Sequence, residues 1–406
     1  MSGRRRLPLF GSLLAGFCSA LGNAVAMVAM PWFVLELTGS PAQAGLVAAA
    51  GIVPLIAGVL FGGALIERFG PRRVAVCGDL LSAVTVAAVP LLHALDALNL
   101  PVLLLLIAAG AVLDGPTRVA ADSRRPELAR LARMRLERAT SFDEMLLSLA
   151  ALSGPAVAGL AIVAFGMAPT LYLTAACSLL AAILDAASLP GARRRRLHVD
   201  HAGWRGALAG LRFVFAQPLL RALVWLATAF VAAFGAIESV VMPALYRAQG
   251  SAALELGLFL SAAGGASALA ALGYALYGHR LSRRAVFLGG CALLVLALAI
   301  LALAPPSWRI LAGALAGLGA GPLAPIENAE LMRRAPQVLR AHALGAVAAL
   351  SLASLPLAMI VAGATVEYVG ARPLLIAAAL LLGAMTWRAW RGGALRALDG
   401  AGNGNG

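Results

Sequence analysis

Long apolar runs separated by short polar connections make up almost the whole chain. About twenty apolar residues are enough to span a bilayer as a helix, and the chain repeatedly reaches that length. The predicted spans lie near residues 9–35, 42–66, 74–95, 100–121, 141–164, 169–189, 220–245, 255–278, 285–304, 309–329, 342–365 and 372–390. Because the connections leave little room for a soluble domain, the pattern predicts an all-α polytopic protein of the cell (inner or plasma) membrane, with 12 transmembrane helices.

The longest polar interruption, residues 190–219, divides the spans six and six. We therefore predict an N-terminal six-helix bundle over 1–189, a cytoplasmic linker over 190–219, a C-terminal six-helix bundle over 220–392 and a flexible cytoplasmic tail over 393–406. Within the linker, apolar residues recur at helical spacing from Trp204 to Phe215. This spacing predicts a helix lying in the membrane interface, and a solvated linker is the alternative.

The two halves resemble each other in sequence. The stretch "MPWFVLELTGS" at residues 30–40 is answered by "MPALYRAQGS" at residues 242–251. In each half a glycine also stands ten residues before an arginine pair, Gly62 before Arg72-Arg73 and Gly273 before Arg283-Arg284. Parallel repeats of six spans are an architecture of secondary transporters.

The distribution of charge predicts an orientation. All 32 basic residues are arginine, against 18 acids, which gives a net charge of +14. With the N-terminus in the cytoplasm, only Arg247, Arg309 and Arg372 fall outside the cytoplasmic segments, and the remaining 29 of the 32 lie in or beside them. This bias predicts that both termini are cytoplasmic. It also predicts that the basic runs meet anionic lipid headgroups rather than nucleic acid.

A charged stretch, "GGALIERFGPRR" at residues 62–73, separates the second span from the third. It places Gly63, Glu67-Arg68, Gly70 and Arg72-Arg73 in a pattern that closely resembles the cytoplasmic loop signature of the major facilitator superfamily. Two departures are visible, because glutamate stands where aspartate is usual and Pro71 takes a position that is more often basic. The first helix, "AMPWFVLELTGS", most resembles the drug and siderophore exporters of that superfamily. The resemblance covers the whole chain and implies two pseudo-symmetric six-helix bundles.

The same resemblance implies a gate on the cytoplasmic side. Glu67 and Arg72 would belong to a charge cluster that closes this side during alternating access, with Arg118 and Asp122 of the fourth span as partners. Independently of the family, Gly70 permits a tight reversal of the chain and Pro71 can begin the third helix. A purely topological role of the arginines is the alternative, although it gives no part to Glu67.

The fifth span contains "SGPAVAG" at residues 153–159. In the superfamily, a Gly-Pro pair followed shortly by glycine on this helix is associated with proton-coupled exporters, and Gly154, Pro155 and Gly159 match that pattern in part. Gly154-Pro155 would kink the helix and Gly159 would allow close packing. Because glycine and proline are common in membrane helices, the pattern is only slightly more specific than chance.

An ionisable group inside the bilayer is a candidate functional group because its burial is costly. Two sets of acids have a structural explanation. Asp143 and Glu144 follow Ser141 in "SFDE", which predicts a capping box at the start of the fifth helix. Glu330 precedes Arg334 by four residues, which predicts an ion pair along one helix.

Asp114 and Glu238 lie on the fourth and seventh spans, which face the central cavity in the superfamily. Asp114 precedes Arg118 by four residues, so a local ion pair explains it as well as a coupling role. Glu238 has no charged neighbour within a helical turn, and a low-dielectric cavity favours uptake of a proton by such a carboxylate. We predict Glu238 as the proton-coupling acid, with Asp114 next. A hydrogen bond to another helix, or an arginine from a distant span, is the structural alternative.

Three further residues are candidates to line the cavity: Asn23, Trp32 and Glu327. A helix–helix hydrogen bond explains Asn23 equally well, and the role of Glu327 is undecided. Asp79 and Asp185 lie on spans that line no cavity in the superfamily, so we assign them to cytoplasmic charge networks.

The sequence therefore predicts a secondary transporter, a monomer that exports amphipathic small molecules by proton antiport. The chain has no Gly-x-x-x-x-Gly-Lys phosphate-binding loop, so we expect the proton gradient to supply the energy without a cofactor. Neither metal-ligand spacing nor a catalytic residue is evident, and the chain is not expected to be an enzyme. The alternatives are export or import of a siderophore, a lysolipid or a metabolite on the same fold, and, more remotely, a non-transporting membrane sensor or enzyme.

Overall fold

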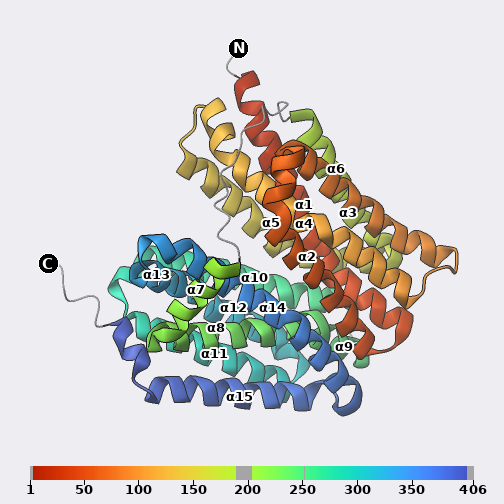
Figure 1. Cartoon of the computed structure of the whole chain (residues 1–406). Coiled ribbons are helices and arrows are strands. Elements are labelled where there is room, and N and C mark those ends of the chain that lie inside the picture. The colour runs from red at the N-terminus through yellow and green to blue at the C-terminus, as the bar shows by residue number, and fades with distance from the viewer. Residues whose placement is uncertain (1–2, 189–203, 251, 400–406) are drawn as a thin grey trace. The chain divides into compact units, whose positions relative to one another are not determined.

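The computed structural model describes residues 3–188, 204–250 and 252–399 (Figure 1). Within these ranges, 12 helical segments are long and apolar enough to cross a membrane. This confirms the predicted all-α, twelve-span fold. Helices suit such runs because each satisfies its backbone N–H and C=O groups internally, which hydrocarbon surroundings demand.

The chain divides into two compact units, each described by itself below. Unit 1 comprises Met1–Val199 and Pro243–Ser261, and unit 2 comprises Asp200–Met242 and Ala262–Gly406. The sequence predicts a boundary at residues 190–219 alone, so the assignment of Pro243–Ser261 to unit 1 differs from it. The reason is close packing between this segment and the fifth span, since a Cβ added at Gly159 would lie 2.7 Å from Leu254 Cα.

Unit 1 consists of six long helices and a short return segment. The six helices are α1 (Gly3–Thr38), α2 (Pro41–Phe69), α3 (Pro71–Ala94), α4 (Leu100–Leu131), α5 (Leu136–Phe165) and α6 (Met167–Ser188). The return segment holds α9 (Met242–Ala248) from Pro243 onward and the first part of α10 (Ala253–Tyr277). The closest helix pairs are α2 with α4, α1 with α6, and α3 with both α4 and α6.

Unit 2 contains the remaining helices. They are α7 (Trp204–Ala216), α8 (Pro218–Ala236), α11 (Arg283–Leu303), α12 (Arg309–Ala320), α13 (Leu323–Arg334), α14 (Gln337–Val369) and α15 (Ala371–Arg391). Short 3₁₀ segments lie at Gly278–Arg280, Pro306–Trp308 and Ala394–Leu398. In this unit α11 packs against α12 and α15, and α14 packs against α7 and α8.

Two spans of unit 2 are interrupted rather than continuous. In the seventh span a π-helical turn, Ile237–Val241, separates α8 from α9. In the tenth span Gly321 and Pro322 separate α12 from α13. A proline lacks the N–H that would continue the hydrogen-bond ladder, which accounts for the second break.

The reversal between α2 and α3 follows the local sequence closely. Gly70 has a φ of 84°, a conformation that side chains other than glycine rarely adopt, and Pro71 is the first residue of α3. The N–H of Gly70 donates to the carbonyl of Ile66, 2.8 Å away, and so closes the last turn of α2. The predicted roles of both residues in this turn are thus present in the structure.

Two predicted connecting segments take a definite form. Helix α7 occupies the stretch for which the sequence predicts an interfacial helix, and its Val214 is fully buried in a cluster with Leu220 and Leu331. Residues 189–203 of the predicted linker lie outside the described part of the chain. The predicted flexible tail instead begins with the 3₁₀ segment Ala394–Leu398, because Leu395 and Leu398 are buried.

Candidate functional site

The predicted gate residues lie at the junction of α2 and α3 in unit 1. Gly63 is part of α2, and the side chains of Glu67, Arg68 and Arg73 are exposed. The guanidinium of Arg72 donates a hydrogen bond to the backbone carbonyl of Ala186. This carbonyl is among the last four of α6, which have no partner within the helix, and a cation at a helix C-terminus is favourable.

The predicted pairing of Glu67 or Arg72 with the end of the fourth span is not formed. Asp122 instead bonds to Arg125 on its own helix, with 2.9 Å between Oδ1 and Nη2. Arg118 is exposed and makes no ion pair within the described residues. The correction has a simple cause, because the carbonyls at the end of α6 supply a closer acceptor for Arg72.

Arg125 also reaches the fifth helix. Its Nη2 lies 2.6 Å from Oδ2 of Asp143, which is buried. The predicted capping box at 141–144 is wrong, because α5 already begins at Leu136 and so places Asp143 inside the helix. Arg125 thus ties α4 to α5 through Asp143 and holds Asp122 as well.

A second ion pair is more deeply buried. Arg124 Nη2 lies 3.2 Å from Oδ2 of Asp185, and the side chains are only 8% and 6% exposed. Arg124 Nη1 and Asp185 Oδ1 are buried without a hydrogen-bond partner in the structure. A pair in such surroundings is costly to break, since either partner left alone would be an uncompensated buried charge.

A serine completes the polar cluster of unit 1. Asp79 on α3 is buried and accepts a hydrogen bond of 3.0 Å from the hydroxyl of Ser19 on α1. With the Arg124–Asp185 pair, polar contacts therefore connect α1 to α3 and α4 to α6. Asp79 and Asp185 were assigned to charge networks from the sequence, but their partners were not identifiable. Arg124 and Arg125 belong to a basic stretch that reads as a topological signal, and only the continuation of α4 to Leu131 reveals their inward contacts.

The glycines of the fifth span lie at close helix contacts within unit 1. A Cβ added at Gly154 would collide with Ala24 of α1. Gly257 at the start of α10 faces the carbonyl of Pro155, and the Ser261 hydroxyl accepts a hydrogen bond of 3.1 Å from Ala156 N. These contacts give Gly154, Pro155 and Gly159 a definite packing role, whatever part they have in transport.

Glu238 lies in unit 2, within the π-helical turn Ile237–Val241. This turn packs against α14 and the end of α8. The side chain of Glu238 is half-buried, and it makes no ion pair or hydrogen bond with any described residue. π-helical turns are rare and are frequent at functional sites. The structure therefore places the most isolated acid of the sequence at an irregular point of its span.

The second interrupted span of unit 2 also carries an acid near its break. Glu327 lies in the first turns of α13, and its Oε1 is buried without a hydrogen-bond partner. One turn further on, Glu330 is only 1% exposed and bonds three arginines. Glu330 Oε1 lies 2.9 Å from Arg283 Nη1 and 3.2 Å from Arg333 Nη1. Its Oε2 lies 3.2 Å from Arg334 Nε. The predicted Glu330–Arg334 pair is present, whereas Glu327 stays unpaired.

The remaining candidates of unit 1 take separate positions. Asp114 is half-buried on α4 and forms no ion pair with Arg118, so the alternative of a local ion pair is not seen in the described structure. Asn23 on α1 is exposed, whereas Trp32 on the same helix is buried. The structure therefore brings none of these three into a common cluster with the buried ion pairs.

The described part of the chain contains neither a candidate metal site nor a disulfide. No group of three or more His, Cys, Asp or Glu side chains there could hold a metal ion. All four cysteines are free thiols.

Comparison with known proteins matches this chain over nearly its full length. The family model of the Major Facilitator Superfamily matches residues 12–348 and 224–397. The multidrug efflux pump Tap of Mycolicibacterium fortuitum is 36% identical over 387 residues, which cover 94% of both chains. Tap of Mycobacterium tuberculosis (strain ATCC 25618 / H37Rv) is 35% identical over 405 residues, which cover 98% of this chain and 96% of that one.

Solved structures show the same fold at low sequence identity. The nucleoside transporter NupG superposes with a TM-score of 0.76 at 14% identity, covering 95% of this chain and 98% of that one. A bacterial homolog of the human lysosomal transporter Spinster superposes with a TM-score of 0.72 at 13% identity, covering 98% of both chains. The family and the transporter class predicted from the loop signature are confirmed: this chain belongs to the major facilitator superfamily.

Proposed function

We propose that this protein exports amphipathic, drug-like small molecules across the cell membrane and that it is driven by proton antiport. The cargo class rests on the two Tap relatives, which are named multidrug efflux pumps and align with almost the whole chain. Both termini face the cytoplasm in this proposal, because 29 of the 32 arginines then lie on that side. We also propose that it acts as a monomer.

Glu238 is the proton-coupling acid of this proposal, and its position in the π-helical turn is the observation that carries it. Substrate and ion sites in transporters are typically formed by discontinuous transmembrane helices. Here each interrupted span of unit 2 has an unpaired acid beside its break, Glu238 in the seventh and Glu327 in the tenth. A cationic substrate and a proton would compete for the Glu238 carboxylate, which is sufficient for antiport.

Transport by the purified chain in proteoliposomes tests this function. An imposed pH gradient should drive uptake of fluorescent cationic dyes into vesicles that hold the transporter in the inverted orientation. In an efflux-deficient bacterial host, expression should raise resistance to several unrelated amphipathic drugs. Resistance without pH-driven transport would retain the export proposal but reject proton coupling, and neither effect with any dye or drug would reject the cargo class.

The loop between α2 and α3 is proposed to act as the cytoplasmic gate, with Arg72 holding the end of α6. Arg72→Ala removes the hydrogen bond to the Ala186 carbonyl and a favourable charge at a helix end, a contact worth about 1–2 kcal/mol. We expect the transport rate to fall roughly tenfold, since about 1.4 kcal/mol corresponds to tenfold, with little change in the amount of inserted protein. Initial rates at saturating substrate measure it.

Arg130→Ala is the matched control for the gate, because Arg130 is exposed near the C-terminal end of α4, has the same charge and is not one of the gate residues. It should transport at the wild-type rate. Equal rates for Arg72→Ala and the wild type would show that the loop only sets topology.

A further inference from the structure

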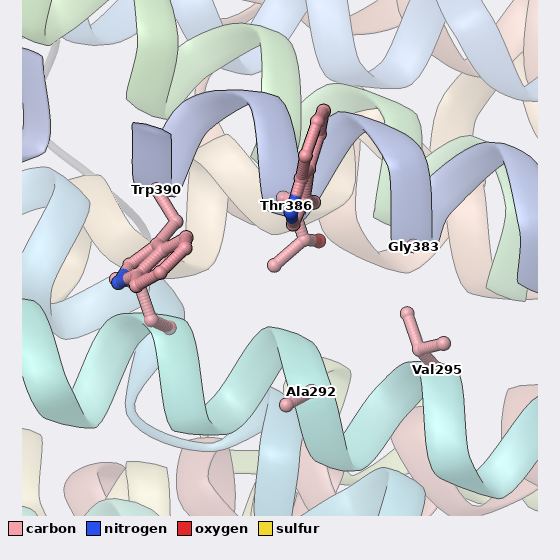
Figure 2. Close-up of a pocket in the computed structure, with 7 residues that line it drawn as sticks. Ala292, Val295, Gly383, Thr386 and Trp390 are labelled. Atoms are coloured by element: carbon pink, nitrogen blue, oxygen red, sulfur yellow. The ribbon is translucent and has the colours of Figure 1, made fainter. Parts of the chain in front are cut away.

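An apolar groove runs between α11 and α15 on unit 2, apart from every residue proposed above for transport. Its lining from α11 is Leu288, Ala292 and Val295, and its lining from α15 is Gly383, Thr386, Trp387 and Trp390. Both sets recur at helical spacing, so each helix contributes one continuous face. Figure 2 shows Val295 pointing from α11 toward α15 near Gly383, and Thr386 and Trp390 projecting from α15 toward α11 across an open space.

Small residues create this groove. Ala292 and Gly383 lie on opposite walls, and a Cβ added at Gly383 would still be 3.5 Å from Val295 Cγ1. The groove has a volume of about 360 Å³, which falls in the range of small-molecule sites. From Gly383 to Trp390 the helix rises about 10 Å, or roughly two thirds of the depth of one leaflet's hydrocarbon, if the ~30 Å core is halved.

The lining is almost entirely apolar, and its polar side-chain groups are one hydroxyl and two indole N–H groups. The only hydroxyl, that of Thr386, already donates to the Leu382 carbonyl of its own helix at 2.8 Å. The other lining side chains are aliphatic or indole. Hydrocarbon is therefore the matching occupant, and α15 belongs to a segment long and apolar enough to be surrounded by lipid. Its exposed apolar side chains, such as Leu380 and Leu381, agree with that setting.

Positive charge gathers at the tryptophan end of the groove. The Arg391 guanidinium stacks over the Trp387 ring with 4.1 Å from Cζ to the ring centroid. Arg284 Nη2 donates to the Trp390 carbonyl at 3.2 Å, and this holds the second guanidinium beside the other tryptophan. The carboxylate of Asp399 accepts hydrogen bonds from the Ser282 hydroxyl at 2.9 Å and from Arg284 N at 3.3 Å.

We propose that this groove binds an anionic phospholipid. One acyl chain lies between α11 and α15, and the phosphate lies against Arg284 and Arg391. Tryptophan is enriched at the membrane interface, and the planar guanidinium of arginine matches the geometry of a phosphate. The tryptophans and arginines therefore lie at the level where the acyl chain of a bound lipid joins its headgroup. In the proposed topology this end faces the cytoplasmic leaflet.

Lipid retention by the full chain tests the site without any transport measurement. The protein is reconstituted into nanodiscs with equal amounts of phosphatidylglycerol and phosphatidylethanolamine, released into detergent and examined by native mass spectrometry. The wild type should retain phosphatidylglycerol over phosphatidylethanolamine by about tenfold, the order expected when two arginines meet an anionic headgroup. Equal retention of the two lipids would overturn the proposal of an anionic ligand.

Two sets of variants separate the groove from general lipid contact. Gly383→Leu fills the groove and should lower the retention of both lipids about tenfold, whereas Gly383→Ala fits without displacing Val295 and should retain them. Should Gly383→Leu fail to fold, Ala292→Leu fills the groove from the opposite wall. Unchanged retention in a folded, filled variant would show that the lipid binds elsewhere.

The charge variants address the headgroup alone. The double variant Arg284→Gln/Arg391→Gln should abolish the preference for phosphatidylglycerol while phosphatidylethanolamine is retained as in the wild type. Arg372→Gln is the matched control, because it removes the same charge from the opposite, exposed end of α15. An equal loss of preference in the control would mean that net charge, rather than this site, selects the lipid.

Discussion

Glu238→Gln is expected to abolish transport driven by a pH gradient while the protein remains folded and inserted. The glutamine keeps the shape of the side chain but can neither release nor take up a proton. Because Glu238 forms no ion pair or hydrogen bond with described residues, its neutralisation leaves no partner unsatisfied. The structural cost should therefore be small, and the loss should fall on coupling. Accumulation of substrate in proteoliposomes with an imposed pH gradient measures it.

Substrate counterflow separates coupling from binding in this variant. Exchange of labelled for unlabelled substrate without a gradient needs no net proton movement, so it should continue in Glu238→Gln. Glu255→Gln is the matched control, because Glu255 is exposed at the start of α10, and it should behave as the wild type in both assays. Uphill accumulation by Glu238→Gln at the wild-type rate would move the coupling role elsewhere, with Asp114 and Glu327 the next acids to neutralise.

Arg124→Leu is expected to destabilise unit 1 more than any other single change considered for this chain. Removal of one partner leaves Asp185 as an unpaired charge in a site only a few per cent exposed, which typically costs about 3–5 kcal/mol. For a unit of this size the melting temperature should fall by about 10 °C. Thermal unfolding in detergent, followed by intrinsic fluorescence, measures the shift.

A double variant shows whether the charge or the packing is responsible. Arg124→Leu/Asp185→Leu replaces both ions by apolar groups and should recover most of the lost stability, since such replacements are often neutral. Arg130→Ala on the exposed side of α4 is the control and should change the unfolding free energy by less than about 0.5 kcal/mol. A melting temperature of Arg124→Leu equal to that of the control would show that the buried pair contributes nothing.

The membrane fold could be predicted from the sequence because length and hydropathy determine it so directly. The turn at Gly70-Pro71 could also be predicted, since glycine adopts the positive φ that a tight reversal needs and proline has the fixed φ of a first helical residue. The C-terminal end of α4 could not be predicted from the sequence. Its last turns to Leu131 are rich in arginine, and a hydropathy pattern ends the span where the charges begin, although the helix continues. The Arg124 and Arg125 pairs were missed for this reason.

The candidate coupling site was predicted in part. The isolation of Glu238 along the sequence was visible, and the structure adds the π-helical turn around it. Pro243 at the end of "AIESVVMP" indicates that the regular hydrogen-bond ladder is disturbed there, but the residue types do not specify a π-helical turn rather than a simple kink. Likewise, the Glu330–Arg334 pair could be predicted from helical spacing, whereas the contact between Glu330 and Arg283 depends on the packing of α11 beside α13.

The π-helical turn at Ile237–Val241 has a consequence for how the seventh span is compared with other proteins. A wide turn accommodates one residue more than an α-helical turn, so every residue from Met242 onward is rotated by about 100° from its place on an uninterrupted helix. A helical wheel drawn through the whole span would assign Tyr246 and its neighbours to the wrong side. A relative without the wide turn should therefore align with this chain only if a one-residue gap is placed between Ile237 and Val241, and the presence of that gap would mark which members of the superfamily share this irregularity.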